Sequence, residues 1–185
     1  MEKENCYLEF DYFEDLNFED LKFTFDKIKY SKNNAIETND IYWLENFPKY
    51  SIEKFWFLDS DLKPNFKTAD KTEFNWHFYS LIELLSIKYG IEYIDLKKVD
   101  KNKGLFEYNP YEYPYGGIDG IVMFVKSFNC IPKIIDDGTS VYEINFETSE
   151  VFNITVLEDE NKQNSSFEKF NAVKLLYKFA NRFIQ

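Results

Sequence analysis

The most regular pattern of apolar and polar positions lies between Ile131 and Leu157. In its later part apolar side chains occupy every second position, namely Tyr142, Ile144, Phe146, Phe152, Ile154 and Val156. Alternation with a period of two predicts strands that bury one face and expose the other. Asp137-Gly138 separates the first two arms and favours a two-residue type I′ turn, because both residues tolerate positive φ. The segment predicts an antiparallel meander with strands at 131–136, 139–147 and 151–157.

Helical spacing is clearest between residues 70 and 89. Apolar side chains recur there at intervals of three and four, at Phe74, Phe78, Leu81, Ile82, Leu85 and Tyr89. Asp70 is a suitable N-cap, Glu73 completes a capping-box pair with it, and Gly90 suits the end of a helix. We expect a helix over 70–89.

Two further segments show the same spacing. Residues 118–129 are apolar on two sides and predict a buried helix, although a buried strand over 121–125 fits the same run. Ser165 and Glu168 form a capping box that opens a last helix over 165–184.

The remaining apolar runs are short. Strands are predicted at residues 6–12, at the alternating Leu21, Phe23 and Phe25, and at residues 91–97 and 105–108. The runs 41–44 and 55–58 suit either a buried strand or a piece of helix. We expect one α+β domain over residues 1–185, with a mainly antiparallel sheet packed by about three helices.

The composition of the chain limits the classes of molecule that it can bind. Aromatic residues make up 20% of the chain and supply a core, while 33 acidic against 22 basic residues give a net charge of −11. That charge repels nucleic acids and anionic membranes and attracts basic proteins. Arg182 is the only arginine, which disfavours a nucleotide enzyme. Cys6 and Cys130 predict two reduced thiols, and the charged N-terminus lacks a signal peptide, so we expect a cytoplasmic protein.

Candidate catalytic and metal-binding groups are few. His77 is the only histidine, and Glu73 stands four residues before it, where the two side chains share a helical flank. Asp119, Asp136 and Asp137 are oxygen ligands for a divalent cation, but Asp-Asp-Gly is equally the composition of a turn. We expect turn chemistry, with no metal, no cofactor and no enzymatic activity.

Uncompensated negative charge is the strongest functional signal. Between residues 134 and 160 the chain contains eight acidic residues and no lysine or arginine. Glu143 and Glu147 share the solvent-exposed face of their predicted strand. A sheet selected for stability would place lysine opposite glutamate on such a face. Such a face suits a basic partner, with tyrosines as anchors. We expect the partner to contact Asp136, Asp137, Glu143, Glu147, Glu150, Tyr113 and Tyr115.

The stretch from Tyr113-Pro114-Tyr115-Gly116-Gly117 to Asp136-Asp137-Gly138 resembles immunity proteins of bacterial polymorphic-toxin loci, of the contact-dependent inhibition type. The resemblance implies an acidic cytoplasmic protein that binds and neutralises a cognate toxin, often a basic nuclease. Two alternatives remain open. One is a DNA mimic that inhibits a nucleic-acid-binding protein, and the other is an enzyme that uses His77 or Asp119 and Asp136.

Overall fold

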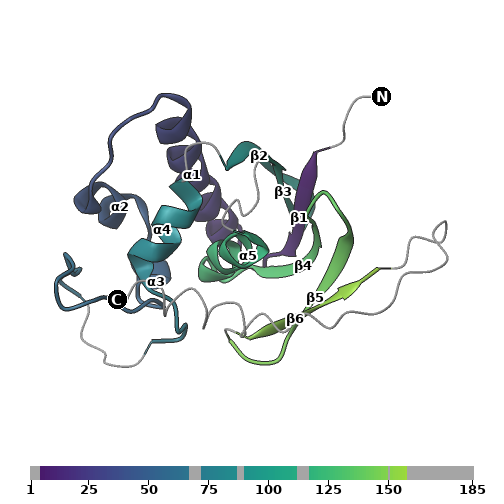
Figure 1. Ribbon diagram of the computed structural model, residues 1–185. Coiled ribbons are helices and arrows are strands. Elements are labelled where there is room, and N and C mark those ends of the chain that lie inside the picture. Colours follow the sequence, from purple (N-terminus) through teal and green to yellow (C-terminus); the bar gives the residue numbers. More distant parts are fainter. Residues whose placement is uncertain (1–4, 67–71, 87–89, 112–116, 150, 158–185) are drawn as a thin grey trace, which may run out of the picture.

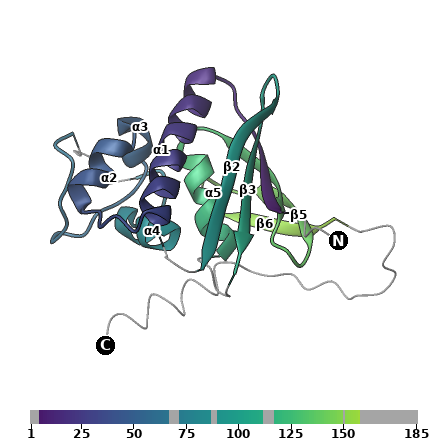
Figure 2. The same cartoon turned by 90° about the horizontal axis from the view of Figure 1, so that it is seen from above.

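The computed structural model of this chain describes residues 5–66, 72–86, 90–111, 117–149 and 151–157. These residues form an α+β fold (Figures 1 and 2). In chain order the elements are β1 (Cys6–Asp11), α1 (Asp15–Asn33), α2 (Asp40–Asn46), α3 (Lys49–Ile52), α4 (Phe78–Ser86), β2 (Ile91–Asp100), β3 (Lys103–Pro110), α5 (Gly117–Ser127), β4 (Ile131–Asp136), β5 (Val141–Phe146) and β6 (Phe152–Val156). No helix among them is long and apolar enough to cross a bilayer.

The strands form a single antiparallel sheet in the order β2-β3-β1-β4-β5-β6. The N-terminal strand β1 lies in the interior of the sheet, between β3 and β4, and joins two hairpins that are distant in sequence. The helices gather on one face of the sheet (Figures 1 and 2). We call the opposite face, which no described helix covers, the outer face.

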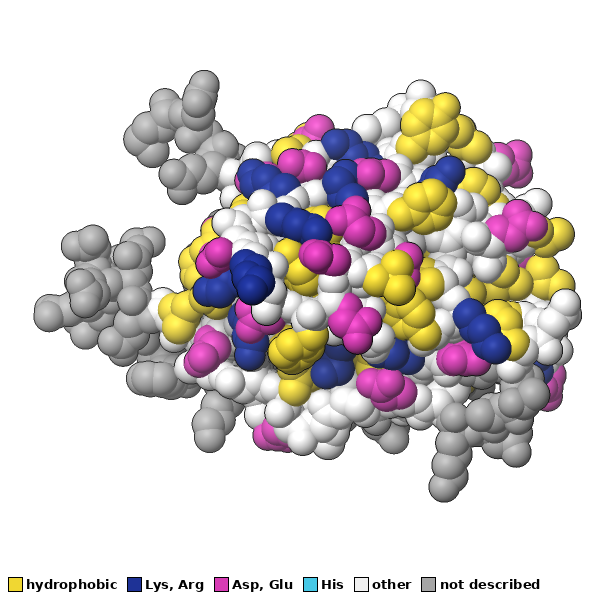
Figure 3. All heavy atoms as spheres, turned by 180° about the vertical axis from the view of Figure 1, so that it is seen from behind, with side chains coloured by type: hydrophobic (Ala, Val, Ile, Leu, Met, Phe, Trp, Pro, Cys, Tyr) yellow, Lys and Arg dark blue, Asp and Glu magenta, His cyan; other side chains and the backbone are white. Residues whose placement is uncertain are grey.

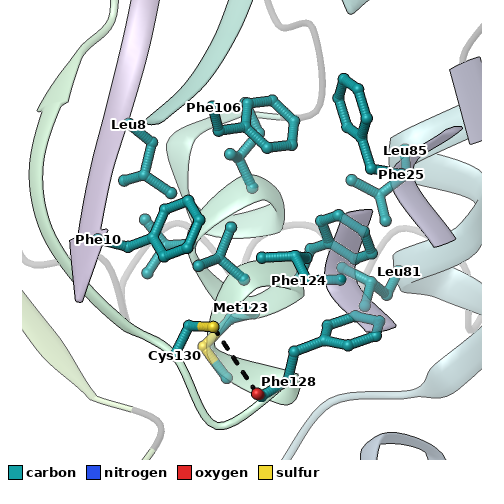
Figure 4. Close-up of a cluster of buried hydrophobic side chains, with 14 of the residues drawn as sticks. Leu8, Phe10, Phe25, Leu81, Leu85, Phe106, Met123, Phe124, Phe128 and Cys130 are labelled. Carbon is teal, nitrogen blue, oxygen red and sulfur yellow. Dashed lines mark hydrogen bonds between the residues drawn. The ribbon is translucent and has the colours of Figure 1, made fainter. Parts of the chain in front are cut away.

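The core lies between the sheet and the helices. Inward side chains of β1 and β3, such as Phe10 and Phe106, meet α1, α4 and α5 there (Figure 4). The predicted helix over 118–129 is confirmed as α5, and its residues 121–125 are all buried, as a helix apolar on two sides requires. Cys6 and Cys130 are buried and form no disulfide, in agreement with the predicted reduced thiols. The Cys130 thiol donates to the Phe128 carbonyl at 3.7 Å.

One predicted strand is wrong. Leu21, Phe23 and Phe25 lie in the long helix α1, where Leu21 and Phe25 are buried and Phe23 is 53% exposed. The three residues alternate, but over a longer window Leu21, Phe25 and Ile28 follow helical spacing, and burial of that stripe against the sheet decides the conformation. Of the two undecided runs, 41–44 lies within α2, whereas 55–58 lies outside every helix and named strand.

The predicted helix over 70–89 is confirmed only in part. Helix α4 begins at Phe78, while Asp70 and residues 87–89 lie outside the described residues. Phe74 is fully buried, yet its backbone N–H donates to the Lys54 carbonyl and the chain there is not helical. A tertiary contact therefore overrides the apolar periodicity at these positions. The predicted helix over 165–184 also lies outside the described residues.

The predicted meander is confirmed as β4, β5 and β6, but its first turn differs from expectation. Residues 137–140 separate the paired Asp136 and Val141, and only Gly138 has positive φ, at 87°. The Asp137 carboxylate accepts the N–H groups of Thr139 and Ser140 at 2.8 and 3.0 Å. This Asx-type bonding closes a four-residue loop in place of a type I′ turn.

Candidate protein-binding surface

The outer face is built from side chains that alternate with the buried residues of each strand. Its register is continuous: Leu105 of β3 pairs with Glu9 of β1, and Glu9 also pairs with Ile134 of β4. Ile134 in turn pairs with Glu143 of β5, which pairs with Thr155 of β6. The row therefore places Glu9 and Glu143 on one surface, with one isoleucine between them.

Four carboxylates form what we call the acidic patch of the outer face: Glu9, Asp136, Glu143 and Glu147. Glu143 and Glu147 are exposed and accept hydrogen bonds from the amide groups of Asn145 and Asn153, respectively. Asp136 accepts the Gly138 N–H at 2.8 Å. Among the described residues no lysine forms an ion pair with any member of the patch. The negative potential of this surface is therefore left uncancelled by short-range pairing.

The structure brings together only some of the predicted contact residues. Asp136, Glu143 and Glu147 share the outer face, whereas the Asp137 carboxylate is turned into its own loop. Glu150, Tyr113 and Tyr115 lie outside the described residues.

Sequence reasoning missed Glu9. Its acidic N-terminal stretch is distant from the meander in the sequence, and no local pattern connects the two. The order β3-β1-β4 places Glu9 beside the meander, and that order is a long-range pairing that no local pattern encodes. The only available signal was the alternation of buried and exposed residues over 6–11, which identifies Glu9 as outward but gives no neighbour.

Several other acids near the N-terminus have a bonding partner. Lys98 of β2 pairs with Asp15 at 2.8 Å and with Glu19 at 3.0 Å, and these hydrogen bonds raise the pKa of Lys98. The Tyr50 hydroxyl donates to Asp20 at 3.0 Å. Seen from behind, lysine and acidic side chains are interspersed across the molecule (Figure 3). Elsewhere on the outer face Asp11 pairs with Lys133 at 3.9 Å and Glu107 with Lys97 at 2.6 Å, so acidic charge without an ion pair is a property of the acidic patch rather than of the whole face.

A second constellation lies where α4 begins. His77 Nε2 is 2.6 Å from Asp61 Oδ2, and His77 Nδ1 is 2.9 Å from Ser80 Oγ. The Ser80 backbone N–H also points to Nδ1, at 3.3 Å, so a neutral ring carries its hydrogen on Nε2 and donates it to Asp61. Asp61 also accepts the Leu58 N–H, and the His77 ring stacks on Trp56 at 4.8 Å between centroids.

This arrangement serves two chemical purposes. As an N-terminal cap, His77 satisfies a backbone N–H of the first turn of α4 and ties the 56–61 loop to it. As an acid–base pair, Asp61 would orient the imidazole while Nδ1 would accept the proton of the Ser80 hydroxyl. The predicted contact of His77 with Glu73 is wrong, because Glu73 precedes the helix and pairs with Lys54 at 3.6 Å.

The described residues contain no group of three or more histidine, cysteine or acidic side chains that could hold a metal ion. The cation site considered for Asp119, Asp136 and Asp137 is therefore not formed in the described part of the chain. Asp119 lies in the first turn of α5, where burial raises the pKa of its carboxyl group. Asp136 and Asp137 serve the turn, in agreement with the preferred interpretation.

Comparison of the chain with protein-family models, curated proteins and solved structures found no match in any of the three.

Proposed function

We propose that this protein is a non-enzymatic binding protein whose acidic patch docks a basic partner, as an immunity protein docks the toxin that it neutralises. The observation that carries the proposal is the bonding of Glu143 and Glu147. Among the described residues their hydrogen-bond partners are asparagine amides and no lysine pairs with them, whereas Asp15, Glu19 and other acids of the same chain contact lysines.

Carboxylates grouped on one sheet face repel one another, and stability alone would favour a lysine among them. An ordered negative surface does favour encounter with a positive one, because complementary potentials raise the association rate and fix the orientation of docking. Immunity function supplies such a partner, since many toxins that act on nucleic acids are basic. The mixed charges of the face in Figure 3 favour a local patch over the extended array that a DNA mimic needs.

The test uses the toxin domain encoded by the neighbouring gene and two charge-reversed variants. Glu143→Lys together with Glu147→Lys alters the patch. Glu37→Lys together with Glu45→Lys makes the same change of net charge at exposed positions before and within α2. Stopped-flow association at several salt concentrations should slow about tenfold or more for the first variant and far less for the second. Bacterial survival during toxin expression should follow the same order.

Equal effects of the two variants would assign the attraction to net charge alone and reject the patch. A neighbouring gene that encodes no toxin domain would reject the immunity role while leaving a basic partner to be found by co-purification.

We propose hydrolysis as a second candidate function, because Asp61, His77 and Ser80 form a continuous hydrogen-bonded chain. Ser80 Oγ would attack an activated ester or phosphonate, and His77 would accept its proton. A fluorophosphonate probe tests this directly. Attack would displace fluoride and leave a Ser80 adduct visible by mass spectrometry. Ser80→Ala keeps the backbone N–H that His77 caps, so it removes the adduct without altering the helix start. An unlabelled wild-type protein would leave His77 with a capping role only.

A further inference from the structure

The sheet has two edges, and the chain treats them differently. At the β2 edge, the α1 side chain Lys29 donates to the Ile94 carbonyl at 2.5 Å, and the pairing with β3 shifts register twice. Lys97 and Lys98 add charge to this strand. A helix above the edge, bulges and lysines are the devices by which proteins prevent unwanted strand pairing.

The β6 edge lacks these devices within the described residues. Its five residues are Phe152, Asn153, Ile154, Thr155 and Val156, none of which is charged, and its pairing with β5 has no register shift. Val156 is 52% exposed and the following Leu157 is 39% exposed. No described side chain forms a hydrogen bond to the backbone of β6.

The direction of the free backbone groups follows from the β5–β6 register. Glu147 N–H bonds to the Val151 carbonyl, and Leu157 N–H bonds to the Val141 carbonyl. Odd-numbered residues of β6 therefore face β5 in hydrogen-bonded pairs, and antiparallel alternation turns the N–H and C=O groups of Phe152, Ile154 and Val156 outward. No described residue bonds to these outward groups.

Charge decides what kind of strand fits this edge. Glu143 lies on β5, one strand inside the edge, and Glu147 directly follows the end of that strand. No lysine of β5 or β6 balances them. A second copy pairing through β6 would bring the same acidic rows toward each other. An added strand would lie two strand spacings, about 10 Å, from β5. Long lysine or arginine side chains on its outer face can extend across β6 toward those carboxylates.

We propose that β6 is a docking strand: a strand of the basic partner adds to it in the plane of the sheet, with its cationic side chains extended toward Glu143 and Glu147. The inference rests on the proposed function and deepens it, since the acidic patch guides the approach and the β6 backbone holds the partner. Main-chain hydrogen bonds then supply affinity while alternate side chains supply specificity.

The probe is a synthetic nonapeptide of alternating lysine and valine, added to the full-length protein. Amide hydrogen exchange is measured residue by residue by NMR. In the free protein, the amides of Phe152, Ile154 and Val156 should exchange rapidly. At saturating peptide their exchange should slow at least about tenfold, whereas Asn153 and Thr155, already bonded to β5, should change little. Protection at alternate residues is specific to strand addition.

Two variants at one position provide the matched control. Val156→Pro removes an outward N–H without removing a bond to β5, and proline is tolerated at such edge positions. Val156→Thr keeps both the N–H and the branched shape. We expect peptide affinity to fall about tenfold for the proline variant and to stay within about twofold for the threonine variant. Wild-type-like circular dichroism confirms that both variants fold.

The outcomes separate this inference from the proposed function. Weaker peptide binding on reversal of Glu143 and Glu147, without alternate protection in β6, would overturn strand docking and retain the acidic surface. If neither the reversal of Glu143 and Glu147 nor Val156→Pro alters peptide binding, both the acidic surface and strand docking are contradicted. Amides at 152, 154 and 156 already protected in the free monomer would show that the chain covers its own edge, and a dimer abolished by Val156→Pro would assign the edge to a second copy; each result overturns the proposal.

Discussion

The two halves of the sheet differ in both packing and charge. In the first half, formed by β2, β3 and β1, the inward residues Leu8 and Phe106 are completely buried. In the second half, formed by β4, β5 and β6, Ile135 is completely buried, but Ile144 and Phe152 are 4% and 6% exposed and Val156 is 52% exposed. Burial therefore declines from the middle of the sheet toward β6.

Charge also differs between the halves, which one ion pair joins: Lys133 of β4 lies 3.9 Å from Asp11 of β1. Lys97 pairs with Glu107 at 2.6 Å, and Lys98 pairs with Asp15 and Glu19, all around the first half. In the second half, Glu143 and Glu147 accept hydrogen bonds from asparagine amides and form no ion pair with a described lysine. The difference is what the proposal of a binding surface rests on: ion pairs and tight packing support the fold in the first half, whereas the second half carries carboxylates without ion pairs in the described part of the chain.

The largest expected effect comes from the same substitution in each half. Phe106→Ala removes a fully buried ring that contacts Phe25 at 5.0 Å and Tyr93 at 5.6 Å between centroids. It should lower the free energy of unfolding by about 3–5 kcal/mol. Phe146→Ala removes a partly buried ring of β5, which contacts Phe152 at 5.4 Å, and should cost about 1–2 kcal/mol. Urea denaturation followed by circular dichroism measures both.

Equal losses for the two alanine variants would break the comparison, because they would show that β5 is packed as tightly as β3. The slopes of the unfolding free energy against urea must agree between the variants, since a change of slope would indicate an altered denatured state.

An intermediate effect concerns alkaline pH. Tyr93 of β2 is buried and donates its hydroxyl to the Leu85 carbonyl at 2.8 Å, and burial raises the pKa of Tyr93 above its ordinary value of 10.0. Because the folded-state pKa is the higher one, the unfolded chain releases its proton first. The stabilising effect is complete below about pH 10 and is lost above it, by up to about 1.4 kcal/mol per pH unit. Denaturation with urea between pH 9 and 11 measures the loss.

Tyr93→Phe is the control for the alkaline experiment. It removes one hydrogen bond and should cost about 1 kcal/mol at neutral pH, but the decline of stability above pH 10 should become shallower. Tyrosinate absorbance should show one fewer late-titrating group. An unchanged alkaline decline would mean that Tyr93 is open to water and that the first half is less closed than its packing indicates.

How much of this molecule was predictable depends on the distance over which each feature is encoded. The alternation within 131–157 specified three strands, and the double apolar face of 118–129 specified α5, because each pattern lies within its own segment. The short alternation at residues 21–25 misled, since α1 becomes recognisable only when Ile28 is included. The start of α4 was misplaced because Phe74 is held by Lys54, twenty residues earlier.

The candidate site shows the same limit. Counting charges was enough to select Glu143 and Glu147, whose strand and face follow from local alternation. Glu9 was missed because only the pairing of β1 with β4 brings it to them. The contact of Asp61 with His77 joins residues sixteen positions apart across a loop with no periodic pattern, so no spacing rule could have predicted it.

The smallest expected effect tests the charges alone. A double-mutant cycle with Lys97→Met and Glu107→Gln should give a coupling energy of about 0.2–1 kcal/mol, as is usual for an exposed ion pair. Glu143→Gln and Glu147→Gln should leave the free energy of unfolding unchanged or raise it by a few tenths of a kcal/mol (roughly), because they remove repulsion and no ion pair. Thermal and urea unfolding at low salt measure both.

Ionic strength provides the control for this last pair of measurements. Salt screens exposed charges, so the Lys97–Glu107 coupling energy and any gain in unfolding free energy from the two glutamine variants should both shrink as salt is added. The coupling energy reports an attraction, whereas the gain reports the removal of a repulsion. Should the glutamine variants instead lose stability at low salt, Glu143 and Glu147 would be holding the fold together. The charge difference between the two halves would then have a structural cause, and the case for a binding surface on the outer face would fail.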